Sequence, residues 1–227
     1  MNWENSKALT ALKRDFLKRF AAANHTFFLT GGSALGIFYL EHRLSYDLDF
    51  FTSESKVDWH LLENLVLGIA ADIRADCRTL TASPDFHRYQ MVRAPESEIL
   101  DFVIERIPQI DERKNDFDGI RVDTVREIMV NKIGTLINRC ELKDVLDLYY
   151  LQLHGYFVRD YWEAARRKEA GLDPAMISFL LSRLKVDAFP DYLLAPLDLP
   201  DFKRFVDQLR AEMARLSFPY NHDKTKS

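Results

Sequence analysis

FFLTGGSALGIFYLEHRLSYDLDFFT, the segment from Phe27 to Thr52, narrows the choice of fold more than any other part of the chain. It opens with an apolar run that predicts a short buried strand. Gly31 and Gly32 then allow a tight turn with positive φ and a close backbone approach. The following residues, from Ser33 to Leu40, predict a helix that begins at Ser33. A glycine turn that leads into a helix directs N–H groups at an anion, usually a phosphate.

The end of the same segment carries two aspartates spaced by one residue. Polar and apolar residues alternate there, which predicts a strand. Asp47 and Asp49 are expected on one side of that strand, and Leu48 and Phe50 in the core. Two like charges at this spacing are costly to bury alone, and a divalent cation offsets the cost. Oxygen ligands that leave room for phosphates suit Mg²⁺, with Mn²⁺ as the alternative.

The order strand, Gly-Gly-Ser turn, helix, and strand with Asp-x-Asp resembles the nucleotidyltransferase superfamily defined by DNA polymerase β. The sequence motif LTGGSAL…HRLSYDLDFF is similar to that of the AbiEii/AbiGii toxin family of nucleotidyltransferases, from abortive-infection and type IV toxin–antitoxin systems. The resemblance places nucleotide phosphates beside Gly31, Gly32 and Ser33. It also implies that Arg43 meets phosphate oxygens and that Ser45 donates a hydrogen bond. Taken singly, these two residues are more typical of a helix terminus and a turn.

A third carboxylate is expected from a neighbouring strand. The run Glu98 to Ile104, EILDFVI, predicts an apolar strand with Asp101 in its middle. An unpaired aspartate there is expensive, so the alternatives are a functional site or an edge strand on which Asp101 faces water. The upstream Asp-x-Asp favours the site. By resemblance, Asp101 helps to deprotonate the attacking hydroxyl, and it joins Asp47 and Asp49 as a metal ligand.

A second block, KIGTLINRCELKDVLDL from Lys132 to Leu148, resembles the later motif of the same family. That motif has the form Lys-Leu-x-x-x-x-x-Arg followed by Arg-Asp-x-x-Asp-Leu. Two departures are mild, because Ile133 replaces the leucine and Lys143 replaces the arginine. The resemblance predicts that this helical block contributes to the site.

The charged residues of the second block have the spacing of shared helix faces. Lys132 and Arg139 are seven residues apart, and Asp144 and Asp147 are three apart. The two cations are expected to bind the triphosphate or the negative charge of the transition state. Asp144 would fix one of them by a charge-assisted bond, and Asp147 would contact the nucleotide or act in catalysis. A surface helix with ordinary ion pairs is the alternative.

The fold class expected is α+β. Residues 1–122 would form a nucleotidyltransferase-like mixed β-sheet with flanking helices, and residues 123–227 a helical C-terminal half. Helical periodicity predicts a first helix over residues 5–23, whose basic residues, Lys13 among them, are expected on a solvated face. The remaining helices and strands are expected at residues 57–73, 77–81, 86–92, 99–104, 120–122, 124–139, 142–153, 158–170, 174 onward and 201–216.

Composition limits the cellular compartment and the kinds of partner that are expected for this protein. The chain has 31 basic and 35 acidic residues and a net charge of −4, so it is no general nucleic-acid coat, although a local basic patch could bind RNA. Two cysteines suit a reducing cytosol. Neither a signal-peptide pattern nor a membrane-spanning apolar run is found, so a cytoplasmic protein without membrane contact is expected.

The function expected is Mg²⁺-dependent transfer of NMP from an NTP to an acceptor, with release of pyrophosphate. The resemblance implies that the acceptor can be the 3′ end of tRNA and that a cognate antitoxin can neutralise a toxic effect. Two alternatives stay open. One is a non-catalytic protein that binds a nucleotide or a partner on the same fold, and the other is a nucleotidyltransferase that modifies a small molecule or a protein.

Overall fold

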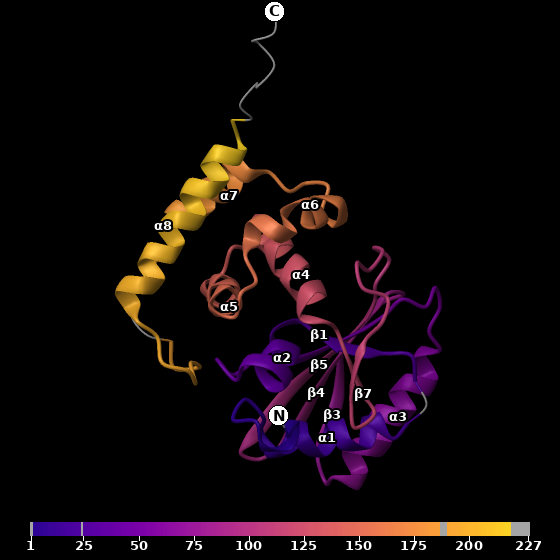
Figure 1. Cartoon of the computed structure of the whole chain (residues 1–227). Coiled ribbons are helices and arrows are strands. Elements are labelled where there is room, and N and C mark those ends of the chain that lie inside the picture. Colours follow the sequence, from indigo (N-terminus) through magenta and orange to yellow (C-terminus); the bar gives the residue numbers. More distant parts are fainter. Residues whose placement is uncertain (1, 24, 187–189, 219–227) are drawn as a thin grey trace, which may run out of the picture. The chain divides into compact units, whose positions relative to one another are not determined.

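The structure is a computed structural model that describes residues 2–23, 25–186 and 190–218 (Figure 1). The chain divides into two compact units. The sheet unit comprises Met1–Ile128 and Asp191–Pro196, and the helical unit comprises Met129–Pro190 and Leu197–Ser227. The division falls inside helix α4 (Val125–Asn138). The boundary predicted at residue 122 lies just before this helix.

The sheet unit is built on a seven-stranded mixed sheet with the order β3-β4-β5-β2-β1-β7-β6. The pairs β2·β5 and β1·β7 are parallel and the other pairs are antiparallel. This confirms the α+β class with a mixed sheet. The strands are β1 (Phe28–Thr30), β2 (Asp47–Thr52), β3 (Asp76–Ala82), β4 (Phe86–Arg93), β5 (Glu96–Ile104), β6 (Asn115–Phe117) and β7 (Ile120–Val122).

One face of the sheet is an aromatic core covered by helix α1 (Ala11–Ala21). The Phe20 ring centroid lies 4.8 Å from that of Phe50 on β2 and 5.6 Å from that of Phe102 on β5. The rings of Phe50 and Phe102 stack with centroids 5.0 Å apart. Side chains alternate along a strand. Because Leu48 and Phe50 of β2 face this core, Asp47 and Asp49 of β2 face the opposite side of the sheet.

Helix α1 begins later than the periodicity predicts. Thr10 is its N-cap and accepts a hydrogen bond from the Lys13 backbone, while the Glu96 carboxylate accepts from the backbone N–H groups of Ala11 and Leu12 at 3.0 and 2.6 Å. Before this cap only a short 3₁₀ turn, η1 (Trp3–Asn5), forms. The predicted start at residue 5 was wrong because an acid on a distant strand completes the cap.

The helix after the glycine turn starts two residues before the predicted Ser33. Helix α2 (Gly31–Leu35) continues directly into a π-helical turn, η2 (Gly36–Leu40). Glu41 ends it with a left-handed φ of 48°. The predicted end at Leu40 is therefore confirmed. The remaining helix of this unit, α3 (Trp59–Asp72), agrees with its prediction to within two residues at its start.

The helical unit contains α5 (Leu142–Leu153), α6 (Val158–Lys168), α7 (Pro174–Ser182) and α8 (Leu199–Leu216). Tyr149 of α5 packs on Phe202 and Phe205 of α8, with ring centroids 5.3 and 5.4 Å apart. Helix α8 begins before the predicted residue 201 because Asp198 caps it. Within the described residues, every helix is too short or too polar to cross a membrane.

Candidate active site

Three aspartates lie on one face of the sheet, opposite the aromatic core. Asp49 of β2 and Asp101 of β5 are directly paired in the parallel register, and directly paired residues face the same side of a sheet. Asp47 lies two residues before Asp49 and shares its face. The structure therefore places the three carboxylates that the sequence predicts on one face of the sheet. Asp101 is not on an edge strand, because β5 lies between β4 and β2.

The glycine turn lies against these acids. Gly31 has a φ of +69°, and a Cβ built on it would lie 2.6 Å from Oδ2 of Asp49. Gly32 has no positive φ, but a Cβ there would collide with the Arg43 guanidinium and lie 3.2 Å from Oγ of Ser45. The prediction of positive φ thus holds for Gly31, and the prediction of close backbone approach holds for both glycines.

Hydroxyl groups orient the start of β2. Ser33 donates a hydrogen bond to the carbonyl oxygen of Asp47, and Ser45 donates to Oδ1 of Asp47 at 2.8 Å. Arg43 is buried and donates to the carbonyl oxygen of Leu44 at 2.9 Å. Ser33, Arg43 and Ser45 therefore lie in one cluster with the first aspartate, whereas the predicted Arg139 and Asp144 belong to the helical unit.

A buried lysine that the sequence analysis placed on a solvated face supports this cluster. Lys13 of α1 is 2% exposed and forms an ion pair with Glu98 at 2.9 Å. It also donates to the carbonyl oxygen of Ser45. Burial raises the pKa of the Glu98 carboxyl, and Lys13 and Thr10 oppose this shift. The expectation for Lys13 was wrong because α1 and β5 enclose its ammonium group; Glu98, an acid inside an apolar strand, was the available signal.

Segment 191–196, which the sequence did not connect with the site, pairs with the residues around Arg43. Leu44 donates to the carbonyl oxygen of Tyr192 at 2.8 Å, and Leu194 donates to that of His42 at 2.9 Å. Arg43 and Leu193 form an antiparallel bridge. These backbone bonds fix the loop that leads into β2.

Asp101 has a partner that the sequence did not reveal. Arg88 of β4 lies directly opposite it in the antiparallel register. Its Nε and Nη2 donate to Oδ1 and Oδ2 of Asp101, each at 2.7 Å. The Arg88 side chain is 43% exposed, whereas that of Asp101 is 8% exposed. Hydrogen bonding to Asp101 raises the pKa of Arg88, and the charges of Asp101, Asp47 and Asp49 add to this effect.

The donor set of this face fits a hard divalent cation in its chemistry. The ligands offered are carboxylate oxygens, which suit Mg²⁺ or Mn²⁺, and Asp47 and Asp49 are only partly buried. Within the described residues, however, no three His, Cys, Asp or Glu side chains converge as a metal-binding group. Asp101, bound at both oxygens by Arg88, is the carboxylate that would have to be freed.

The second predicted group lies within the helical unit and α4. Lys132 contacts Asp144 at 3.0 Å and Asp147 at 2.6 Å, and its side chain is 6% exposed. Arg139 donates to both oxygens of Asp144 at 2.8 and 2.9 Å. Asp144 thus fixes both cations, and a solvated cationic face is excluded for Lys132. Burial alone would raise the pKa of Asp144, but the bonds and charges of Arg139 and Lys132 outweigh it and lower that pKa.

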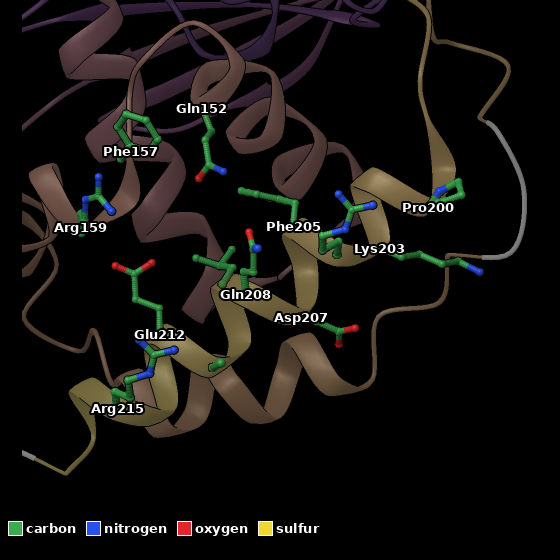
Figure 2. A pocket seen from close by; sticks show the side chains of 13 residues that line it. Gln152, Phe157, Arg159, Pro200, Lys203, Phe205, Asp207, Gln208, Glu212 and Arg215 are labelled. Carbon is green, nitrogen blue, oxygen red and sulfur yellow. The ribbon is translucent and has the colours of Figure 1, made fainter.

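The helical unit also contains a cavity of about 960 Å³ along α8 (Figure 2). Gln152, Phe157 and Arg159 line it together with α8 residues that include Glu212 and Arg215. None of the predicted site residues is among the described residues that line it. This cavity therefore does not coincide with the clustered charges that the sequence predicts as the site.

Comparisons with known proteins identify the family of the chain. The family profile described as nucleotidyl transferase AbiEii toxin, type IV TA system, matches residues 15–220. The chain belongs to this family of toxin-like nucleotidyltransferases. No match is found among the curated protein sequences.

Solved structures from Helicobacter pylori share the fold. One is JHP933, with a TM-score of 0.55 and 21% identity over 91% of this chain and 90% of that chain. Another, provisionally described as a nucleotidyltransferase, has a TM-score of 0.55 and 20% identity over 91% of this chain and 93% of that chain. At this identity the likeness concerns the fold.

Proposed function

We propose that the chain transfers an NMP group from an NTP to a hydroxyl acceptor, with release of pyrophosphate, at the acidic face of its sheet. The observation that supports this most is the placement of Asp47, Asp49 and Asp101 on one face beside the Gly31 turn. Nucleotidyl transfer needs positioned phosphates and neutralised charge more than reactive side chains. A carboxylate cluster next to a glycine turn offers these two properties.

The reaction requires a divalent cation in this proposal. Asp47 and Asp49 would hold Mg²⁺, or Mn²⁺, and Asp101 would complete the ligand set. When bound, the cation neutralises the triphosphate and orients it for an in-line displacement. Asp101 accepts the proton of the attacking hydroxyl at its carboxylate. The bond from the acceptor oxygen to the α-phosphorus forms as the bond from that phosphorus to the pyrophosphate oxygen breaks.

The glycine turn and its neighbours would bind the triphosphate. Gly31 and Gly32 allow backbone N–H groups to approach phosphate oxygens closely. Ser33 and Ser45 already hold Asp47 in place. Arg43 is packed against Gly32, so it brings a fixed positive charge to the same turn. We assign these residues to nucleotide binding.

We assign the ion-paired group around Asp144, which lies in the helical unit, the role in the reaction that the family resemblance implies. Lys132 and Arg139 would stabilise the charge that grows on the leaving pyrophosphate. Asp144 keeps both cations in one arrangement, and the Arg139 side chain is 45% exposed. Asp147 would act beside Lys132, with which it is paired. Preorganised charges of this kind need no reorientation when the reaction proceeds.

The biological setting follows from the family. We propose an RNA acceptor, the 3′ end of tRNA, and a toxic outcome that a cognate antitoxin neutralises. A non-catalytic binding protein is disfavoured because the chain carries every residue predicted for the acidic face and for the Lys132 group. Modification of a small molecule or a protein stays the alternative reaction, and the choice of acceptor in the experiment below separates the two.

Labelled NTPs test the proposal. Wild-type protein is incubated with Mg²⁺, total tRNA and each NTP labelled at the α- or γ-phosphate. The α-label should enter RNA and the γ-label should leave as pyrophosphate, whereas EDTA or Asp47→Asn should abolish both. Label on protein or a small molecule instead of RNA would favour the alternative acceptor. Transfer that Asp47→Asn leaves unchanged would remove the acidic face from the reaction.

A further inference from the structure

Arg88 is the ion-pair partner of Asp101 within the described residues. The guanidinium binds both carboxylate oxygens at 2.7 Å. This two-point arrangement is the strong, oriented form of an arginine–carboxylate pair. The arginine comes from β4 and is set by the sheet register, so the contact does not depend on a loop.

The same contact opposes metal binding. A metal ligated by Asp101 would place two positive charges within a few ångströms of each other, since Arg88 already occupies both oxygens. Like charges at about 4 Å repel by several kcal/mol at the effective dielectric constant of a protein surface. Arg88 is 43% exposed, so its side chain has room to swing into water.

We propose that Arg88 is a positioning residue that competes with the divalent cation for Asp101, and so sets the metal concentration at which the site becomes complete. The inference rests on the metal ligands named in the proposed function. Without metal, Arg88 neutralises and orients Asp101. With metal bound, Arg88 releases Asp101, which then serves as the third ligand. The apparent metal affinity is the intrinsic affinity multiplied by the fraction of molecules in which Asp101 is released.

Binding of Mn²⁺ alone tests this without NTP or acceptor. Free Mn²⁺ is followed by electron paramagnetic resonance during titration of wild type, Arg88→Gln, Arg88→Lys and Arg78→Gln. Arg88→Gln should bind Mn²⁺ about threefold to tenfold more tightly, as expected for loss of a partly exposed ion pair. Arg88→Lys keeps the charge but not the two-point contact, so its Mn²⁺ affinity should lie between those of wild type and Arg88→Gln. Arg78, on β3, donates to Gln90, and its replacement is the matched control that should change nothing.

A double-mutant cycle separates direct competition from a general charge effect. In an Asp101→Asn background, Arg88→Gln should no longer alter Mn²⁺ affinity. An equal gain in affinity with and without Asp101, or no gain in either Arg88 variant, would overturn the proposal. Melting temperatures identify any variant that fails to fold, and Arg88→Lys then carries the test. A protein that binds Mn²⁺ as described but transfers no NMP would contradict the proposed function and leave this inference standing.

Discussion

Asp101 of the sheet unit and Asp144 of the helical unit are both buried aspartates that accept two hydrogen bonds from one arginine. They differ in what else binds them. Asp144 also pairs with Lys132, which is itself buried and extends to Asp147. Asp101 pairs with Arg88 as its one ion-pair partner in the described part of the chain. Asp144 belongs to a group that contains two cations, one of them buried, and a second aspartate, whereas Asp101 has a single, half-exposed cation as its ion-pair partner in the described residues.

The difference separates a carboxylate that can change partners from one that cannot. Removing Arg88 from Asp101 exposes the arginine to water, which solvates it. Removing Lys132 leaves the buried Asp144 and Asp147 without their shared cation in a low-dielectric interior, where an unpaired charge costs several kcal/mol. Exchange of partners is what a metal ligand requires. We therefore expect substitutions in the sheet unit to affect mainly activity, and those around Asp144 to affect stability as well.

The largest expected effect is on catalysis. Asp101→Asn should reduce NMP transfer by at least about a hundredfold, because the amide cannot accept the hydroxyl proton. NTP binding should stay measurable, since Asp47, Asp49 and the glycine turn are unchanged. Transfer rates and NTP binding are measured side by side. The matched control is Asp76→Asn, which changes an exposed aspartate on β3 and should retain full activity. Normal transfer by Asp101→Asn would show that Asp101 takes no part in the reaction.

The second effect is on stability. Lys132→Met should lower the free energy of unfolding by about 3–5 kcal/mol, since it leaves Asp144 and Asp147 without their shared cation. The matched control is Lys143→Met, because the Lys143 side chain is 38% exposed and its ammonium pairs with Glu141 on the surface. That variant should stay within about 0.5 kcal/mol of wild type. Chemical denaturation measures both. Equal stability of the two variants would contradict the comparison between the two groups.

The third prediction compares alanine substitutions at two glycines, Gly31 and Gly68. Gly31→Ala places a methyl group beside Asp49 and forces a left-handed residue, which costs about 1–2 kcal/mol. Activity should fall at least about tenfold because Asp49 must move. Gly68 lies in α3 with no atom within 4 Å of a built Cβ. Gly68→Ala should raise stability by about 0.5–1 kcal/mol and leave transfer unchanged. Full activity of Gly31→Ala would show that the close approach is dispensable.

The smallest effect is a pH dependence in the helical unit. The folded state lowers the pKa of Asp144 below its ordinary 3.8, so its charged form stabilises the fold above that pH. This contribution is lost as the pH falls through the folded-state value. The gap in melting temperature between wild type and Asp144→Asn should be constant from pH 7 to about pH 5 and narrow below about pH 3.8. A gap that persists unchanged into strong acid would argue against the assigned charge state.

Local pattern was enough to predict much of the sheet and the identity of its acids. The alternation around Asp47 and the apolar run around Asp101 each indicate a strand. The order of these motifs along the chain predicts that the two strands carry one site. Partners set by register were beyond reach, because Arg88 meets Asp101 only through the pairing of β4 with β5. Strand β6 was also missed, since Asn115 to Phe117 shows no alternation and pairs with β7 through the Asp118–Gly119 turn.

Transfer of α-labelled NMP by Asp49→Asn tests the central claim most directly. The substitution keeps the size of the side chain and removes one charge from the face shared by Asp47, Asp49 and Asp101. The account predicts a folded protein with a melting temperature close to that of wild type and no detectable transfer at any Mg²⁺ concentration. Transfer at the wild-type rate would contradict it.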